Sequence, residues 1–188
     1  MVFKRLDWCC FISQTGGELV QLCQRLKILP NRVITNNQKK ISESSWKFFR
    51  ENGIIVVCIP FKPTWEHYRA AGFNNLVTLH GYLRILPKEY FGMSCSCNTY
   101  NGHPGLITEY PELKGFNPQD RAFEGRYTTI GSVVHEVTEG VDEGKVVATY
   151  QTTMTGQETL DEYYDRLRTC SLLAWDKFFV DYLESVSS

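Results

Sequence analysis

Short apolar runs alternate with helical repeats through the first half of the chain. Cys9–Ile12 is an apolar run that ends in a glycine loop, and apolar residues from Leu19 to Leu26 then recur at helical spacing. Arg32–Thr35 predicts a second strand. Ser42–Ser45 offers capping side chains for a second helix, which Asn52-Gly53 should end. The pattern therefore predicts two consecutive strand–helix units.

The next apolar run, Ile54–Ile59, shows no polar alternation. Such a run is typical of a strand that is buried on both faces of a parallel sheet. We expect a short helix over Thr64–Ala71 and a further strand over Leu76–Leu79, which leads into Gly81–Pro87. Strands that alternate with helices favour an α/β fold with an open, mostly parallel sheet and right-handed crossovers.

The second half of the chain has a different pattern. Glycine and proline place Asn101–Gly105 and Tyr110-Pro111 in expected loops, whereas Gly131–Val137 predicts a strand. Val146–Tyr150 should pair with that strand as its antiparallel neighbour, across a turn at Asp142–Gly144. The C-terminal half therefore adds an antiparallel edge to the sheet.

A long amphipathic helix is expected to close the chain. Thr159 and Glu162 have the spacing of a capping box. An apolar stripe suited to packing on a sheet follows, made of Leu160, Tyr163, Leu167, Leu172, Trp175, Phe179 and Leu183. The 188 residues show no repeat, low-complexity segment or linker. We therefore expect one domain over residues 1–188.

Charge and composition narrow the classes of partner. Twenty Lys and Arg residues nearly balance 21 Asp and Glu residues, so the chain has no broad positive field of the kind that holds tRNA or duplex DNA. No apolar run approaches the roughly 20 residues of a membrane span, and Met1–Arg5 leads into Asp7 and Trp8 rather than into a secretory signal. We expect a cytoplasmic protein without nucleic-acid or membrane partners. The oligomeric state stays open.

The seven cysteines do not form a recognisable framework. Cys9 and Cys10 are adjacent, and one residue separates Cys95 from Cys97, whereas zinc pairs usually have two to four residues between them. We expect free, mostly buried thiols and no metal site.

Three polar residues stand where an open α/β sheet would present them to a crevice. Asn101 and His103 lie in a glycine-proline segment, and Asp142 lies in a turn beyond a strand. Taken singly, each residue is equally typical of an ordinary turn or surface position. Their significance depends on the sequence around them.

Four blocks, in this order, resemble those of the folate-dependent formyltransferases, in particular the glycinamide ribonucleotide transformylases. The blocks are Ile12–Leu19, Leu79–Leu86, Asn101–Leu106, and Gly131–Thr138 followed by Val141–Gly144. The third block is similar to the family's Asn-x-His-Pro-Ser-Leu core, and the last contains its Asp-x-Gly. The resemblance implies a Rossmann-like formyltransferase fold and 10-formyltetrahydrofolate as the formyl donor.

The resemblance also implies binding residues. The donor would be held mainly by backbone groups near Arg84, Ile85 and Leu86 and by the loop through Val141 and Asp142. The acceptor would be held by the first glycine loop, made of Thr15, Gly16, Gly17 and Glu18. His80 stands where the family usually has a small residue. His135 matches a family position, but a role as a hydrogen-bonded core histidine explains it equally well.

The expected chemistry needs the residue types of the third and fourth blocks. An amine that attacks a formyl carbon creates a tetrahedral intermediate with negative charge on oxygen. Asn101 and a protonated His103 can donate to that oxygen, and one such donor is worth about 3 kcal/mol. Asp142 can orient His103, favour its charged form and assist proton transfer. No metal or covalent nucleophile is needed.

The acceptor amine is less well defined. We expect glycinamide ribonucleotide, although this chain has Gly16-Gly17-Glu18 where the ribotide enzymes have Gly-Ser-Asn. Glu18 should therefore point away from a bound phosphate or pair with a nearby base. Lys114–Pro118, followed by Arg121, looks more like a segment of the methionyl-tRNA and sugar enzymes. An amino sugar nucleotide is the second candidate, hydrolysis of the donor the third, and a non-catalytic folate- or nucleotide-binding homologue the remaining alternative.

Overall fold

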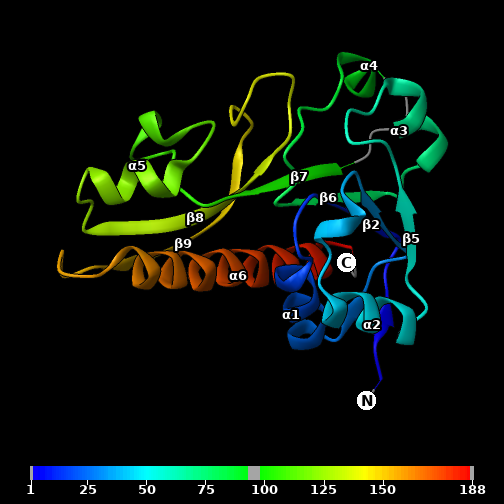
Figure 1. The fold of residues 1–188 in the computed structure, drawn as a ribbon, viewed down its shortest axis with the longest axis horizontal. Coiled ribbons are helices and arrows are strands. Elements are labelled where there is room, and N and C mark those ends of the chain that lie inside the picture. The colour runs from blue at the N-terminus through cyan, green and yellow to red at the C-terminus, as the bar shows by residue number, and fades with distance from the viewer. Residues whose placement is uncertain (1, 93–97, 187–188) are drawn as a thin grey trace. The chain divides into compact units, whose positions relative to one another are not determined.

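The computed structural model describes residues 2–92 and 98–186, which fall into two compact units. The first is Met1–Tyr100 and the second Asn101–Ser188. Figure 1 shows the succession of helices and strands along the chain. That residues 1–188 act as one domain stays a prediction.

The first unit contains a parallel sheet of four strands. These are β2 (Trp8–Ile12), β4 (Arg32–Thr35), β5 (Ile55–Cys58) and β6 (Leu76–His80), in the order β5-β4-β2-β6. Every residue of β2 is buried, because this strand has a neighbour on each side and carries only apolar side chains. A short parallel pair, β1 (Lys4–Arg5) and β3 (Ile28–Leu29), lies outside this sheet.

The helices described in the first unit are α1 (Gly17–Leu26), α2 (Glu43–Glu51), α3 (Trp65–Ala71) and α4 (Lys88–Phe91), with a 3-10 turn at Gln38–Lys40. Two of these four helices, α2 and α3, begin at residues whose hydrogen bonds cap them. The Ser42 hydroxyl accepts a hydrogen bond from the Ser45 backbone N–H, and Asn52 ends the same helix, as expected. His67 caps α3, because its Nδ1 accepts from the Thr64 backbone N–H at 3.1 Å. The helix α4 was not predicted.

The burial expected for Ile54–Ile59 is wrong. β5 is parallel to β4, but it ends the four-strand order, and 61% of the Ile55 side chain is exposed. Cys58, on the opposite face, is exposed as well. A run of β-branched residues reflects strand propensity, whereas burial on both faces requires a central place in the sheet, which the run does not encode.

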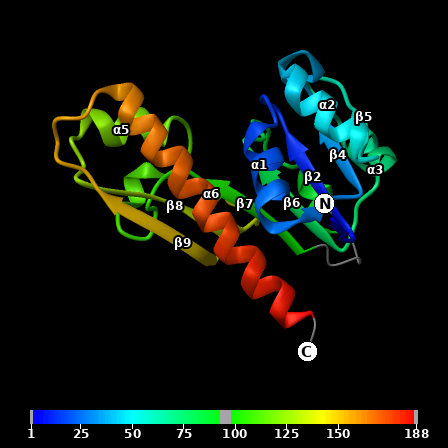
Figure 2. The same cartoon turned by 90° about the horizontal axis from the view of Figure 1, so that it is seen from below.

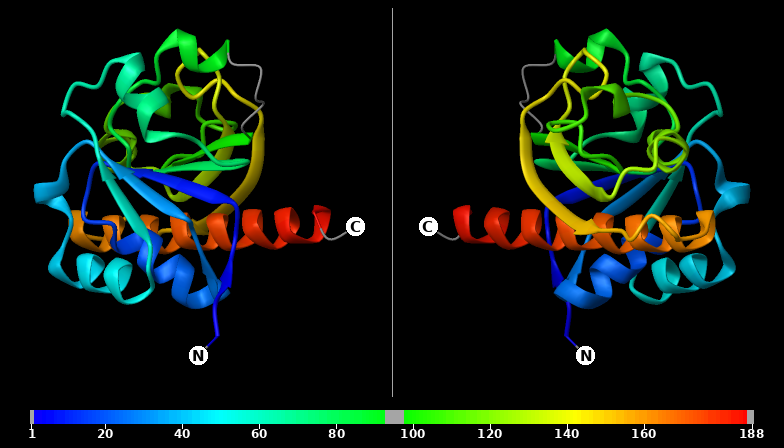
Figure 3. Two further views of the ribbon diagram at one scale, coloured as in Figure 1. Left: turned by 90° about the vertical axis from the view of Figure 1, so that its right-hand side faces the viewer. Right: turned by 90° about the vertical axis from the view of Figure 1, so that its left-hand side faces the viewer.

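The second unit is built on an antiparallel pair and a long helix. β8 (Thr129–Glu136) pairs antiparallel with β9 (Val146–Thr153), as predicted. The helix α6 (Leu160–Ser185) begins at the expected capping box of Thr159 and Glu162 and packs along this pair (Figures 2 and 3). The core of the unit is a cluster of buried apolar side chains: Leu106, Ile107, Leu113, Ala122, Ile130, Val133, Met154, Tyr163 and Leu167.

One further strand crosses the boundary between the units. β7 (Asn98–His103) contains the Asn101-Gly102-His103 segment, which we had expected in a loop. That expectation is wrong, because glycine here serves a close contact rather than a turn. After β7 the chain forms a 3-10 turn at Pro111–Leu113 and a short helix, α5 (Pro118–Glu124).

The expected fold class is confirmed: a mostly parallel α/β sheet with flanking helices and an antiparallel pair in the C-terminal half. Cys9, Cys10, Cys23 and Cys170 are buried, and burial raises the pKa of the Cys23 thiol to about 12. Cys95 and Cys97 lie outside the described residues. Within residues 2–92 and 98–186, no helix combines the length and apolar character needed to cross a membrane.

Candidate functional site

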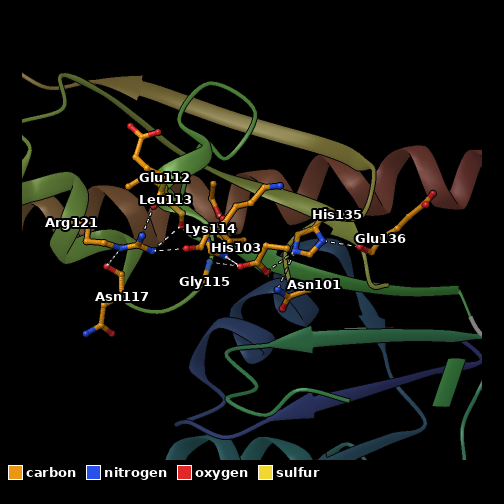
Figure 4. Close-up of polar contacts among 12 residues, drawn as sticks. Asn101, His103, Glu112, Leu113, Lys114, Gly115, Asn117, Arg121, His135 and Glu136 are labelled. Atoms are coloured by element: carbon orange, nitrogen blue, oxygen red, sulfur yellow. Dashed lines mark hydrogen bonds and ion pairs between the residues drawn. The ribbon is translucent and has the colours of Figure 1, made fainter. Parts of the chain in front are cut away.

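The three predicted catalytic residues belong to one hydrogen-bonded cluster in the second unit. Asn101 and His103 are two positions apart on β7, so they share one face of that strand. Asp142 follows β8 in the turn that leads to β9. The Asp142 carboxylate lies 3.1 Å from His103 Nδ1 and 3.3 Å from His135 Nε2. Asn101 joins the cluster through His135 (Figure 4).

Both ring nitrogens of His103 face acceptors. Nε2 lies 2.9 Å from the backbone carbonyl of Leu113, and Nδ1 faces the Asp142 carboxylate. A carbonyl oxygen can only accept, so Nε2 must carry a hydrogen, and an ionised carboxylate requires a hydrogen on Nδ1 as well. The geometry therefore suits the doubly protonated, positively charged ring that the expected chemistry requires.

The surroundings of Asp142 keep its carboxyl ionised. Burial alone would raise the pKa, because the side chain is only 10% exposed. Hydrogen bonds from His103 and His135, the charge of His103 and the Gly115 backbone N–H at 2.8 Å outweigh burial and hold the pKa well below its usual range. Asp142 also has a left-handed backbone, with φ 54°. Residues other than glycine, asparagine and aspartate rarely adopt this conformation.

His135 is a fourth member of the cluster. Its Nδ1 donates to the Glu136 carbonyl at 2.7 Å, while Nε2 lies 3.2 Å from the Asn101 amide nitrogen and 3.3 Å from Asp142. A neutral ring accepts from Asn101 at Nε2, whereas a charged ring donates from Nε2 to Asp142. The histidine is buried and hydrogen-bonded, but its partners are the predicted catalytic residues. A polar side chain on the strand face that it shares with Val133 and Val137 was the available signal.

The strand pair is irregular beside the cluster. Val134 pairs with Ala148, but His135 pairs with Val146, so the register shifts between Val134 and His135. Irregularities of this kind redirect side chains and recur beside functional sites. Here the shift occurs at the residue that contacts both Asn101 and Asp142.

Two glycines allow close approaches that shape the cluster. A Cβ on Gly102 would lie 2.6 Å from Trp175 Nε1, so only glycine lets the indole ring rest against β7 between Asn101 and His103. A Cβ on Gly144 would lie 1.8 Å from the Glu136 carbonyl oxygen. Gly144 therefore lets the turn that carries Asp142 close tightly on the end of β8.

The predicted acceptor-binding residues lie in the first unit, at the start of α1. Gly16 has a left-handed backbone with φ 77°, and the Thr15 hydroxyl accepts from the Gly17 N–H at 3.3 Å. The Glu18 carboxylate lies 3.1 Å from Nδ1 of His80, which is buried. The expectation that Glu18 pairs with a nearby base is thus confirmed, and its partner is the histidine that stands where a small residue was expected.

The predicted donor-binding residues differ in exposure. Ile85 is 73% exposed, whereas Leu86 is buried. The Arg84 guanidinium lies over the Phe61 ring, 4.1 Å from its centroid, and its Nε donates to the Phe61 carbonyl. Val141, next to Asp142 in the second unit, is 48% exposed. Their part in donor binding stays a prediction.

Among the residues that the structure describes, no group of three or more His, Cys, Asp or Glu side chains has the arrangement to hold a metal ion.

Comparisons with known proteins identify the class of this chain. Residues 62–173 match the family described as formyl transferase. A methionyl-tRNA formyltransferase of Bifidobacterium longum is 34% identical over 113 residues, which is 58% of this chain and 33% of that protein. A phosphoribosylglycinamide formyltransferase of Dictyostelium discoideum is 31% identical over 100 residues, which is 49% of this chain and 47% of that protein. The chain thus spans less than half the length of either relative.

The fold has solved counterparts. The crystal structure of a phosphoribosylglycinamide formyltransferase from Anaplasma phagocytophilum matches with a TM-score of 0.78 and 22% identity. The match covers 93% of this chain and 84% of that one. This likeness establishes the fold.

Proposed function

Because the chain belongs to the formyl transferase family, we propose that it transfers a formyl group from 10-formyltetrahydrofolate to the amine of a small acceptor. The observation that carries the proposal is the hydrogen-bonded cluster of Asn101, His103, His135 and Asp142. It combines a neutral amide donor, a ring suited to positive charge and an ionised carboxylate within one partly buried group of side chains.

In this proposal the amide of Asn101 and the charge of His103 stabilise the oxygen that becomes negative when the amine attacks. Both ring hydrogens of His103 already have acceptors, Leu113 and Asp142. His103 therefore acts through its positive charge, or by direct donation once its Nε2–H leaves the Leu113 carbonyl. When His135 is neutral, one amide hydrogen of Asn101 points at its Nε2 and the second stays available to donate. When His135 is charged and donates to Asp142, neither amide hydrogen is used by His135.

Asp142 is assigned to proton transfer. Its carboxylate is ionised near neutral pH, so it can accept a hydrogen bond from the attacking amine or a bridging water and take up the proton. Because its pKa is depressed, the carboxylate is a weak base and must pass the proton on at once. The departing folate nitrogen must receive a proton, and the charged His103 ring can give it the Nε2 proton once that hydrogen leaves the Leu113 carbonyl. The proton that Asp142 takes from the amine then passes to solvent, which returns one to Nε2 of His103. This assignment needs no covalent enzyme intermediate.

For the donor, we propose contacts with the backbone near Arg84, Ile85 and Leu86 and with the loop at Val141 and Asp142. The exposed apolar side chains of Leu83 and Ile85 support the first part, since they leave apolar surface available to a flat ring system. The exposed Val141 supports the second, because it directly precedes Asp142.

For the acceptor, we propose glycinamide ribonucleotide held at Thr15–Glu18. Backbone N–H groups at the start of α1 favour an anion, and a phosphoribosylglycinamide formyltransferase is among the relatives. The Glu18 carboxylate at the start of the same helix opposes a phosphate on these backbone groups. An amino sugar nucleotide is the second candidate, because Lys114–Pro118, followed by Arg121, resembles a segment of the sugar enzymes.

The test is an acceptor screen. Purified protein is incubated with 10-formyltetrahydrofolate and either glycinamide ribonucleotide or an amino sugar nucleotide, and mass spectrometry detects the formylated amine. Release of formate without any acceptor amine would indicate hydrolysis instead. If donor binds but no formyl group leaves it under any of these conditions, the catalytic proposal is wrong and the non-catalytic alternative holds.

A further inference from the structure

One guanidinium group, that of Arg121, binds three consecutive carbonyls of the loop between β7 and α5. Arg121, on α5, donates from Nη1 to the carbonyl of Glu112, and from Nη2 to the carbonyls of Leu113 and Lys114 at 3.2 and 2.8 Å. Figure 4 shows these three consecutive carbonyls turned toward Arg121. The planar guanidinium group of arginine can donate hydrogen bonds to several acceptors at once. The ammonium group of lysine cannot reproduce this geometry.

The same loop contacts both ends of the His103–Asp142 pair. The Leu113 carbonyl accepts from His103 Nε2 at 2.9 Å, and the Gly115 N–H donates to Asp142 at 2.8 Å. One oxygen, that of Leu113, therefore receives hydrogen bonds from both Arg121 and His103. Any movement of this loop must change the surroundings of both members of the pair.

The loop has little regular structure of its own to fix it. Gly115 and Asn117 both have left-handed backbones, with φ 83° and 50°. Only the 3-10 turn Pro111–Leu113 is regular before α5 begins. A backbone of this kind depends on side-chain partners to hold it in one conformation.

Two acidic side chains near Arg121 accept hydrogen bonds from tyrosines. The Glu112 carboxylate accepts from the Tyr127 hydroxyl, and the Asp120 carboxylate accepts from the Tyr164 hydroxyl at 2.6 Å. Both acids are therefore engaged by tyrosines, while the fork of Arg121 is directed at backbone carbonyls.

We propose that Arg121 is a positioning residue for the reaction: by holding the Glu112–Gly115 loop, it sets the hydrogen bonds that orient His103 and Asp142. The kinetic part of this inference rests on the proposed function. The structural part, control of the His103 ring through the Leu113 carbonyl, does not.

The structural part is tested by NMR on protein with 15N-labelled histidine. The variants are Arg121→Lys, Arg121→Met and, as a matched control, Arg168→Met, which removes an exposed arginine of the same unit paired with Asp165. His103 signals are assigned from their loss in His103→Gln. In the wild type and the control, the His103 ring N–H signals should be protected from exchange with water. They should broaden in Arg121→Met and change less in Arg121→Lys. Unchanged His103 signals in Arg121→Met would overturn the inference.

The kinetic part compares turnover with stability in the same variants. Arg121→Met should lower kcat by about tenfold or more with KM nearly unchanged, because it misplaces catalytic groups without removing a substrate contact. Arg121→Lys should recover part of the loss, and it carries the test if Arg121→Met does not fold. A fall in Tm with unchanged kcat would mean that Arg121 is merely structural. If the wild type transfers no formyl group, the proposed function fails while the NMR experiment still decides the role of Arg121.

Discussion

Asp142 Oδ2 accepts from two groups that come from different segments of the second unit: His103 Nδ1 at 3.1 Å and the Gly115 N–H at 2.8 Å. The first contact comes from a strand and the second from a loop that Arg121 holds. One carboxylate oxygen thereby couples the order of this loop to the orientation of the proposed catalytic histidine.

Removal of either member of the pair should affect turnover far more than folding. His103→Ala and Asp142→Asn should each lower kcat by a factor on the order of a hundred, the usual size of a lost oxyanion donor or proton relay. Asparagine can keep the left-handed backbone and the hydrogen bond from Gly115, so Asp142→Asn isolates the loss of charge. Steady-state kinetics and thermal melts of both variants provide the measurement. Parallel losses of Tm and activity would indicate a structural role for both residues.

The depressed pKa of Asp142 predicts how stability changes with pH. A carboxyl with a folded pKa below its unfolded value, 3.8, contributes stability above that value and loses it as the pH falls toward the folded pKa. The unfolding free energy of the wild type should therefore fall more steeply between about pH 5 and pH 2 than that of Asp142→Asn. Urea unfolding of both proteins across this range gives the comparison. Parallel curves would contradict a depressed pKa.

Gly102 and Trp175 should be energetically coupled. A Cβ at position 102 would meet Trp175 Nε1 at 2.6 Å and Cε2 at 3.0 Å, so Gly102→Ala forces the indole ring or β7 to move. We expect a destabilisation of about 1–3 kcal/mol, the usual cost of overpacking. Trp175→Leu removes the ring atoms that the new methyl group would meet.

A double-mutant cycle with urea unfolding checks this coupling. Alanine at position 102 should cost less in the Trp175→Leu background than in the wild type, although Trp175→Leu alone also destabilises the core. Additive losses would show that the contact at Gly102 does not determine the cost. Gly102 lies between Asn101 and His103, so a displacement of β7 should also move these two residues. The same variants should therefore lower turnover in proportion to that displacement.

Local patterns along the chain predicted much of the fold. Arg32–Thr35 forms a strand with the expected bounds, and Thr159 and Glu162 start α6, because strand runs and helix caps are properties of neighbouring residues. The contacts among the residues of the site could not be predicted from such local patterns. His103 meets Leu113 and Asp142, and Arg121 holds the intervening loop, through contacts that depend on how distant segments pack. The exposure of Ile55 escaped prediction for the same reason.

Glu18 should weaken the binding of a phosphorylated acceptor. Its carboxylate lies at the start of α1, where a phosphate on the same backbone groups would meet a like charge. At an effective dielectric of about 20, two like charges about 4 Å apart repel by about 4 kcal/mol. Glu18 is one-third exposed and paired with His80, and both reduce this repulsion. We therefore expect Glu18 to oppose a bound phosphate by about 1 kcal/mol. Glu18→Asn should therefore lower the KM for glycinamide ribonucleotide about fivefold, with kcat nearly unchanged, since ground state and transition state gain equally. Glu51→Gln, an exposed acid of α2, is the matched control. If the wild type is inactive on this ribotide and Glu18→Asn does not help, yet an amino sugar nucleotide is formylated, the first proposed acceptor is wrong and the second replaces it.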